Sequence, residues 1–298
     1  AALALTLSAT AQTPSWIRRN SMSPDGSTIA FSYKGDIYTV PASGGQARQI
    51  TSNQAFDSNP IWTRDGKNIV FISYRESGKD IYITPENGGV PRRITNLPGN
   101  ETPLAVLPDG SILFSWYNGS IESESYGDFP GTAQLYRTDI HGAAPELVTS
   151  LPVKALSINS EGTIIYEDYK GYEDDLRKHH TSSVTRDIWK YVPAAGDKRL
   201  CINSNGSFTR LSDYKGEDRN PVFAADGDTF YYLSERDGKT SNVYRSSLSA
   251  PQTSVQLTFE TRNPVRFLSV SEDGTLAFSL NGDLYTMKDG ALPAKVPI

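Results

Sequence analysis

Residues 23–45 read SPDGSTIAFSYKGDIYTVPASGG and place two tight turns around strand-like sequence. In the first turn, SPDG at 23–26, proline presets φ, aspartate favours a local hydrogen-bonded bend, and glycine accepts a left-handed backbone. The apolar run after it is rich in β-branched and aromatic residues, which is typical of a strand buried on both faces. A second turn, SGG at 43–45, closes the phrase. The stretch therefore predicts consecutive antiparallel strands joined by short turns.

The same phrase recurs six times along the chain. An acidic residue followed by glycine begins each copy, at positions 25–26, 65–66, 109–110, 161–162, 226–227 and 273–274. An apolar run follows, then an aliphatic–aromatic pair such as Ile37-Tyr38, and in five copies an aliphatic–Thr/Ser pair such as Ile50-Thr51. Four-stranded units repeated at about 40–50 residues are the signature of a β-propeller. The repeats therefore predict an all-β fold, a six-bladed β-propeller of four-stranded antiparallel blades. A β-sandwich of similar hairpins is the alternative, and it does not require such constant phrasing.

The composition limits the classes of function open to the chain. Its 298 residues are 37% hydrophobic and 21% charged, which provides enough apolar side chains for a sizeable core. Lys and Arg number 29 against 34 Asp and Glu, and the net charge of −5 argues against a surface that binds nucleic acid or anionic membranes. The one cysteine, Cys201, excludes an intramolecular disulfide framework. We expect a globular protein with no nucleic-acid partner and no membrane span.

The N-terminal residues have the character of an export signal. Residues 1–11, AALALTLSATA, are small and apolar, and Ala9-Thr10-Ala11 has the A-x-A form read by signal peptidase. They are too few to span a membrane. We interpret residues 1–13 as the remnant of a secretory signal peptide and residues 14–298 as a single propeller domain. The alternative is an ordinary apolar strand at the N-terminus. The signal interpretation predicts a periplasmic or secreted protein.

Two of the six copies carry long insertions. The extra residues are YNGSIESESYGDFPGTAQ at 117–134 and YKGYEDDLRKHHTSSVTR at 169–186. We expect both between the second and third strands of their blades, on the face opposite the glycine turns. Loops that differ between repeats are the usual place for function on a propeller, because the strands are held by packing.

The insertions supply the candidate binding surface. The first is acidic and contains Glu122, Glu124 and Asp128. The second supplies the candidate binding residues, which are Arg177, Lys178, His179, His180 and Arg186. A charged surface of this kind is more often solvated or in contact with another domain than part of a ligand site.

The residue inventory predicts no catalytic or metal site. There are three histidines, and His141 lies in turn-like sequence. His179 and His180 are adjacent and lack a third imidazole to complete a metal site. No G-x-S-x-G nucleophile elbow is present. The aspartate that recurs once per repeat is explained by its role in the turn, where it favours a hydrogen-bonded bend. We therefore predict no catalytic residue, no metal and no cofactor in this chain.

Several phrases resemble the N-terminal six-bladed propeller of tricorn-like serine peptidases and, more distantly, the propeller of TolB. They are residues 23–45, NPIWTRDGKNIVFIS (59–73), VTRDIWKY (184–191), GEDRNPVF (216–223) and FYYLSERDGKTSNVYRSSL (230–248). The resemblance covers residues 16–298. In tricorn-like proteins such a propeller is followed by further domains, including a PDZ module and a catalytic domain with a serine nucleophile. The resemblance therefore carries no catalytic residue onto this chain.

Two functional hypotheses follow from the resemblance. The first is a non-catalytic propeller of an exported tricorn-like serine peptidase, which guides or gates peptides and docks to downstream PDZ and peptidase domains of the same polypeptide. Hydrolysis of peptides would then belong to those domains. The alternative is a free-standing, TolB-like periplasmic propeller that binds a protein partner at the face with the insertions. A propeller lyase or glycan hydrolase is disfavoured because the chain has no histidine cluster.

Overall fold

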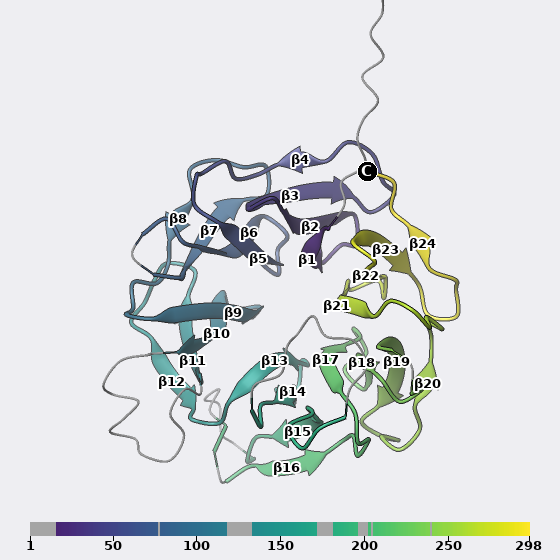
Figure 1. Ribbon diagram of the computed structural model, residues 1–298. Helices are drawn as coiled ribbons and strands as arrows, with labels where there is room; N and C mark the ends of the chain where they lie inside the picture. Colours follow the sequence, from purple (N-terminus) through teal and green to yellow (C-terminus); the bar gives the residue numbers. More distant parts are fainter. Residues whose placement is uncertain are drawn as a thin grey trace, which may run out of the picture.

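The chain forms a ring of six antiparallel β-sheets around a central channel. The computed structural model describes residues 16–76, 78–117, 133–171, 181–195, 202–203, 205–238 and 240–298. Within these ranges each sheet has four strands in sequential order. The sheets are arranged as blades around one axis (Figure 1). The predicted six-bladed β-propeller is therefore confirmed.

The first three blades follow one another along the N-terminal half of the chain. Blade 1 consists of β1 (Arg18–Met22), β2 (Thr28–Tyr33), β3 (Asp36–Pro41) and β4 (Arg48–Gln49). Blade 2 consists of β5 (Asp57–Trp62), β6 (Asn68–Ser73), β7 (Asp80–Pro85) and β8 (Arg92–Arg93). Blade 3 consists of β9 (Asn100–Val106), β10 (Ser111–Tyr117), β11 (Gln134–Asp139) and β12 (Glu146–Thr149).

The other three blades complete the ring. Blade 4 consists of β13 (Val153–Ile158), β14 (Ile164–Asp168), β15 (Ile188–Val192) and β16 (Ser207–Arg210). Blade 5 consists of β17 (Asp218–Phe223), β18 (Thr229–Ser234), β19 (Asn242–Ser247) and β20 (Val255–Gln256). Blade 6 consists of β21 (Val265–Val270), β22 (Leu276–Leu280), β23 (Asp283–Met287) and β24 (Ala294–Lys295).

The first strand of each blade lies nearest the channel and the fourth lies at the outer rim (Figure 1). The rim strands are short, which limits edge-to-edge pairing with other chains. Blades 1 and 6 each keep their own four strands, so contacts between the two blades close the ring. The Ile17 N–H donates to the Gly282 carbonyl at 3.0 Å, and the Glu272 N–H donates to the Pro24 carbonyl at 2.8 Å.

The connections emerge on two faces of the ring. The turn face carries the acidic–glycine turns between first and second strands and the turns between third and fourth strands. The linker face carries the loops between second and third strands and the links from one blade to the next. On the turn face, the glycines of all six acidic–glycine turns have φ between 69° and 83°. Only glycine adopts such φ values without strain, which explains why this residue recurs.

Apolar side chains fill the spaces between neighbouring blades. The second strands are the most buried: Phe31, Phe71, Phe114 and Phe278 are each at most 1% exposed. Phe71 packs with Trp62 and with residues of blade 1. Because burial of a large aromatic side chain is worth about 2–3 kcal/mol, these clusters are the main force holding the blades together.

The recurring aliphatic–Thr/Ser pair lies at the end of the fourth strand or just beyond it. In four blades its hydroxyl accepts a hydrogen bond from the backbone N–H of the aliphatic residue that begins or nearly begins the third strand. This contact joins Thr51 to Ile37 at 3.0 Å, Thr95 to Ile81 at 2.9 Å, Ser212 to Ile188 at 2.9 Å and Thr258 to Val243 at 2.8 Å. The pair therefore serves the fold.

The two insertions lie where the sequence predicts them. Strand β10 ends at Tyr117 and β11 begins at Gln134, while β14 ends at Asp168 and β15 begins at Ile188. Both insertions therefore join a second strand to a third and leave from the linker face. Residues 118–132 and 172–180 lie outside the described residues.

Candidate functional site

The six strands that line the channel are irregular in the same region. Each of β1, β5, β9, β13, β17 and β21 shows a shift of register against the second strand of its blade. Four residues at these bulges have positive φ, namely Arg19 (53°), Asn59 (57°), Asn220 (53°) and Phe267 (58°). Positive φ is uncommon for side chains other than glycine, although Asn tolerates it. Bulges of this kind redirect side chains and are frequent next to functional sites.

Asparagine side chains join neighbouring inner strands at the bulges. The Asn20 Nδ2 donates to the Phe267 carbonyl at 2.9 Å, and the Asn59 Nδ2 donates to the Pro103 carbonyl at 3.2 Å. Asn220 both donates to the Leu268 carbonyl and accepts the Leu268 N–H, each at 3.0 Å. These bonds hold the backbone of the channel lining in place where blade 6 meets blade 1, where blade 2 meets blade 3 and where blade 5 meets blade 6.

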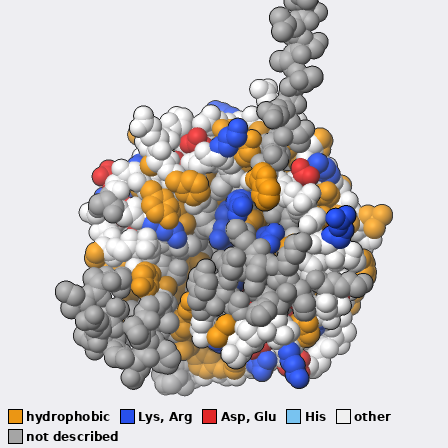
Figure 2. Space-filling model, in the orientation of Figure 1, with side chains coloured by type: hydrophobic (Ala, Val, Ile, Leu, Met, Phe, Trp, Pro, Cys, Tyr) orange, Lys and Arg blue, Asp and Glu red, His pale blue; other side chains and the backbone are white. Residues whose placement is uncertain are grey.

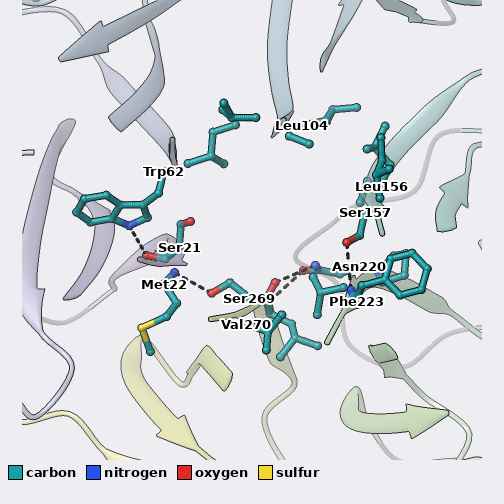
Figure 3. Close-up of a pocket in the computed structure, with 18 of the residues that line it drawn as sticks. Ser21, Met22, Trp62, Leu104, Leu156, Ser157, Asn220, Phe223, Ser269 and Val270 are labelled. Atoms are coloured by element: carbon teal, nitrogen blue, oxygen red, sulfur yellow. Dashed lines mark hydrogen bonds between the residues drawn. The ribbon is translucent and has the colours of Figure 1, made fainter. Parts of the chain in front are cut away.

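Further hydrogen bonds between blades lie deeper in the channel. Figure 3 shows the Met22 N–H donating to Ser269 Oγ and the Phe223 N–H donating to Ser157 Oγ, at 3.0 and 3.1 Å. The Trp62 indole donates to the Ser21 carbonyl at 3.1 Å. The channel wall is therefore a preorganised surface.

The channel contains a cavity of about 640 Å³. Its lining is strongly basic: among the described residues that line it, six are Lys or Arg and two are Glu. These eight are Arg19, Arg64, Lys154, Arg186, Arg219, Arg266, Glu167 and Glu272. Figure 2 shows Lys and Arg side chains near the centre of the face in view. This distribution contrasts with the net charge of −5 for the whole chain.

The charges are divided unequally between the two ends of the channel. Arg64 and Glu272 belong to acidic–glycine turns, so one charge of each sign lies at the turn-face end. Four basic residues lie at or near the beginnings of inner strands, at the linker-face end, and we call them the basic mouth: Arg19 of β1, Lys154 of β13, Arg219 of β17 and Arg266 of β21.

Aromatic rings orient two members of the basic mouth. The guanidinium carbon of Arg19 lies 5.0 Å from the centre of the Phe267 ring on the neighbouring blade. The ammonium of Lys154 lies 4.6 Å from the centre of the Tyr169 ring. Cation–π contacts of this type favour the charged form and restrict the rotamers of a long side chain. Both residues are exposed.

Lys79, immediately before β7, extends the positive region toward blade 3. Its Nζ donates to Thr102 Oγ1 at 2.6 Å. Burial, together with the positive charges of Arg19 and Lys154, lowers the pKa of Lys79 to about 8. Glu101 lies beside it, and burial next to the Asp80 carboxylate raises the pKa of Glu101 to about 8. The carboxylate of Glu101 acts on Lys79 in the opposite direction to burial and raises the pKa of Lys79.

Arg186, predicted as part of the exposed insertion surface, is buried. Its side chain is 4% exposed, and its Nη1 lies 2.8 Å from Glu167 Oε1, which is equally buried. The other oxygen of Glu167 accepts the Asn220 N–H at 2.8 Å. Burial raises the pKa of Glu167, while Arg186 opposes the shift. The placement on an exposed wall was wrong for Arg186, because the chain turns inward at Thr185 and Arg186 before it enters β15.

The remaining candidate binding residues, Arg177, Lys178, His179 and His180, lie outside the described residues. The structure therefore does not bring them together with Arg186, and their role stays a prediction. His141 lies in the turn between β11 and β12, where its N–H donates to Asp139 Oδ1 at 2.8 Å.

Blades 2 and 5 share a second polar arrangement that the sequence reasoning missed. Arg75 lies 2.8 Å from the buried Asp57, and Arg236 lies 2.9 Å from the buried Asp218. Each arginine also lies over tyrosine rings of its own blade. The signal was present as Asp-x-Asn-Pro at the start of β5 and β17, with Ser-x-Arg ending β6 and β18. These pairs anchor the loop after the second strand.

Neither metal binding nor membrane insertion is indicated by the described part of the chain. In those residues no three His, Cys, Asp or Glu side chains lie close enough together to hold a metal ion. The same residues include no helix with the length and apolar character needed to cross a membrane.

The fold and the site together define a β-propeller whose central channel has a basic lining and whose inner strands are joined by hydrogen bonds between neighbouring blades. The chain matches the tricorn protease N-terminal β-propeller domain over residues 17–291, and it belongs to that family. This membership agrees with the resemblance found in the sequence.

Individual relatives are distant and mostly longer. Tricorn protease homolog 1 of Streptomyces coelicolor is 22% identical over 285 residues, covering 92% of this chain and 24% of the relative, so the chain spans about a quarter of that protein. The crystal structure of the tricorn protease superimposes with a TM-score of 0.74 at 21% identity, over 95% of this chain and 26% of that one. The Tol-Pal system protein TolB of Desulfosudis oleivorans is 39% identical over 114 residues, which is 37% of this chain and 24% of TolB.

Proposed function

We propose that this chain is the non-catalytic propeller of an exported tricorn-like serine peptidase, and that it guides or gates peptides for catalytic domains in the same polypeptide. The observation that carries the proposal is the family match over residues 17–291. The channel supports it, because a cavity of about 640 Å³ between rigid strands can admit an extended segment of peptide.

The linker face is the surface that we propose docks to downstream PDZ and peptidase domains. Large apolar side chains are exposed there: Trp16 is 73% exposed, Phe56 55%, Tyr74 47% and Phe259 72%. Phe56 and Tyr74 contact each other edge to face, with ring centres 6.2 Å apart. Exposed aromatic side chains near charged loops are a common feature of surfaces that bind other proteins or domains.

The second insertion is part of this docking proposal. Replacing Arg177, Lys178, His179 and His180 together by Ala is expected to weaken docking and leave the fold intact, because exposed charges change stability by only some tenths of a kcal/mol. Thermal unfolding and a binding assay with the separately produced downstream domains measure the two effects. A collapse of the melting temperature would instead identify the loop as packed structure.

We also propose that residues 1–13 are the remnant of a signal peptide, that residues 14–298 form one domain, and that the protein acts in the periplasm or outside the cell. The A-x-A sequence at 9–11 supports this proposal. Fusion of the N-terminal segment to a reporter that is active only after export tests it.

Peptide binding without hydrolysis is the test of the proposed function. The purified 298-residue chain is titrated with fluorescent peptides, and mass spectrometry follows the peptides over time. The proposal predicts saturable binding and intact peptides. Cleavage sensitive to a serine-directed inhibitor would contradict the non-catalytic role, and the absence of any peptide binding would contradict the guiding role.

A second candidate function is a free-standing, TolB-like propeller that binds a folded protein partner. The observation that favours it is the 39% identity to TolB over 114 residues. This alternative predicts that the linker face binds a folded partner and that free peptides do not bind the channel. Competition between a peptide and a partner for the channel therefore separates the two candidates.

A further inference from the structure

We propose that the middle of the channel selects extended peptide segments whose side chains are uncharged and apolar. The inference rests on the proposed function, since it names the class of peptide that the channel would take. It goes beyond that function because a channel that only guides peptides need not distinguish between their side chains.

The side chains that face the middle of the channel form one ring. In each blade the residue four positions before the acidic residue of the first turn is half-buried and lines the cavity. Its neighbours along the strand are mostly buried, and Figure 3 shows two of them, Trp62 and Phe223, pointing away from the channel. Because side chains alternate along a strand, the half-buried residue faces the cavity. We call these six residues the inner ring: Ser21, Ile61, Ala105, Ser157, Val222 and Ser269.

The lining is uncharged throughout this section of the channel. The section consists of the inner ring and the residue on each side of it, and all of these residues line the cavity. Their sequences are NSM (20–22), PIW (60–62), LAV (104–106), LSI (156–158), PVF (221–223) and LSV (268–270). All are apolar except Asn20 and the three serines. The charged residues of the lining lie outside this section, so the middle of the channel differs in chemistry from its ends.

The polar groups of this section are largely engaged in the wall itself. The side chain of Asn20 donates to a backbone carbonyl of blade 6 at 2.9 Å. The hydroxyls of Ser157 and Ser269 accept backbone N–H groups of the next blade at 3.1 and 3.0 Å. Pro60 and Pro221 have no N–H to donate. A carboxylate or an ammonium in this section would therefore lose water without gaining an ionic partner there, which is costly.

An extended peptide fits this section better than a small apolar molecule does. Each of the six inner strands is an end strand of its sheet, and its inner edge faces the channel (Figure 1). An extended peptide can form backbone hydrogen bonds with such an edge while its side chains contact the wall. The cavity volume of about 640 Å³ lies within the usual range of ligand sites. Apolar peptide side chains would then leave water for the uncharged inner ring.

Fluorescence anisotropy with four short peptides tests the proposal. The peptides alternate Ser with Leu, Gln, Glu or Lys, and both ends are blocked so that only the side chains differ. We expect the Leu peptide to bind at least about tenfold more tightly than the Gln peptide, because side-chain amides would lose water at the ring. The Glu and Lys peptides should bind more weakly than the Gln peptide. Raising NaCl from about 50 mM to about 300 mM should leave the preference for Leu over Gln unchanged, since neither peptide is charged.

Variants then assign the preference to the inner ring. Val222→Asp places a carboxylate in the ring and should weaken binding of the Leu peptide by at least about tenfold. Val222→Thr keeps the shape of the side chain and should weaken it by about threefold, and it decides the matter if the Asp variant does not fold. Val90→Asp is the matched control, because Val90 is 92% exposed and does not line the cavity. It should leave the affinity unchanged.

The outcomes separate this inference from the proposed function. Equal binding of the Leu and Gln peptides, or tighter binding of the Glu or Lys peptide, would overturn the apolar selection and leave the guiding role standing. A preference for Leu that persists unchanged in folded Val222 variants would also overturn it, since the apolar peptide would then bind elsewhere. Failure of every peptide to bind, blocked or free, would contradict the proposed function itself.

Discussion

The two ends of the channel are built from the same six strands but differ in what the repeats share. At the turn-face end every copy has an acidic residue followed by glycine. In five copies the aspartate accepts a hydrogen bond from its own turn, as Asp65 does from Lys67, and in the fourth copy Asn159 takes this part. At the linker-face end the corresponding residues differ from blade to blade, and Arg, Lys, Asn, Pro and Phe all occur there. Residues that recur serve the fold, whereas residues at one level of the ring that vary from blade to blade can differ in what they do.

The largest expected effect of a single substitution is in the shared scaffold. Phe71→Ala removes a side chain that is fully buried between blades 1 and 2, and it should lower the free energy of unfolding by about 3–5 kcal/mol. Urea denaturation measures the change. Phe56→Ala is the control, because Phe56 is 55% exposed and should cost less than about 1 kcal/mol. Equal costs for the two would show that the core is not located between the blades.

The next effect is a pH dependence at the linker-face end. Burial beside Asp80 raises the pKa of Glu101 from 4.5 to about 8. The folded protein therefore holds a proton that the unfolded chain releases, and stability should fall as pH rises from about 4.5 to about 8. We expect a loss of about 1–2 kcal/mol after allowing for screening by solvent. The lowered pKa of Lys79 acts in the separate window between about 8 and 10.5, where stability should rise with pH.

Glu101→Gln sharpens this prediction. The amide keeps the shape of the protonated side chain and removes the titration, so the slope of stability against pH should flatten between pH 4.5 and 8. Glu146→Gln is the control, because Glu146 is exposed and should leave the slope as in the wild type. Urea midpoints measured across this range report the slope. An unchanged slope in Glu101→Gln would assign the pH dependence to another group.

A smaller effect is expected at a shared turn. Asp65 Oδ1 accepts the Thr63 hydroxyl at 2.6 Å and the Lys67 N–H at 3.1 Å, and these bonds lower the pKa of Asp65. Asp65→Ala should cost about 1 kcal/mol, and Asp65→Asn less, because the amide keeps one acceptor. In the wild type this contribution is present above pH 3.8 and is lost as pH falls through the lowered pKa. If both variants melt at the same temperature as the wild type, the turn aspartate has no structural role and the prediction is wrong.

The smallest change in stability is expected at the basic mouth. Arg19→Gln and Lys154→Gln alter exposed side chains, so the free energy of unfolding should change by less than about 0.5 kcal/mol. The same urea titrations measure it. A cost comparable to that of Phe71→Ala would mean that both ends of the channel serve the fold, and the contrast between them would disappear.

The sequence predicts the architecture well and the site poorly, for a physical reason. Turn glycines and apolar runs are local signals that repeat six times, and the structure confirms the blades and the position of both insertions. The basic mouth depends on bulges, such as that at Arg19, whose register appears only when strands pair. Arg186 illustrates the same limit: its place at the end of a charged insertion indicated exposure, whereas its partner Glu167 lies on the neighbouring strand β14, 19 residues earlier.

Titration of the purified 298-residue chain with fluorescent peptides, followed by mass spectrometry, tests most directly whether the propeller binds peptides without cleaving them. The account predicts saturable binding and intact peptides. A folded chain that binds no peptide, or that cleaves peptides in a reaction stopped by a serine-directed inhibitor, would contradict the account.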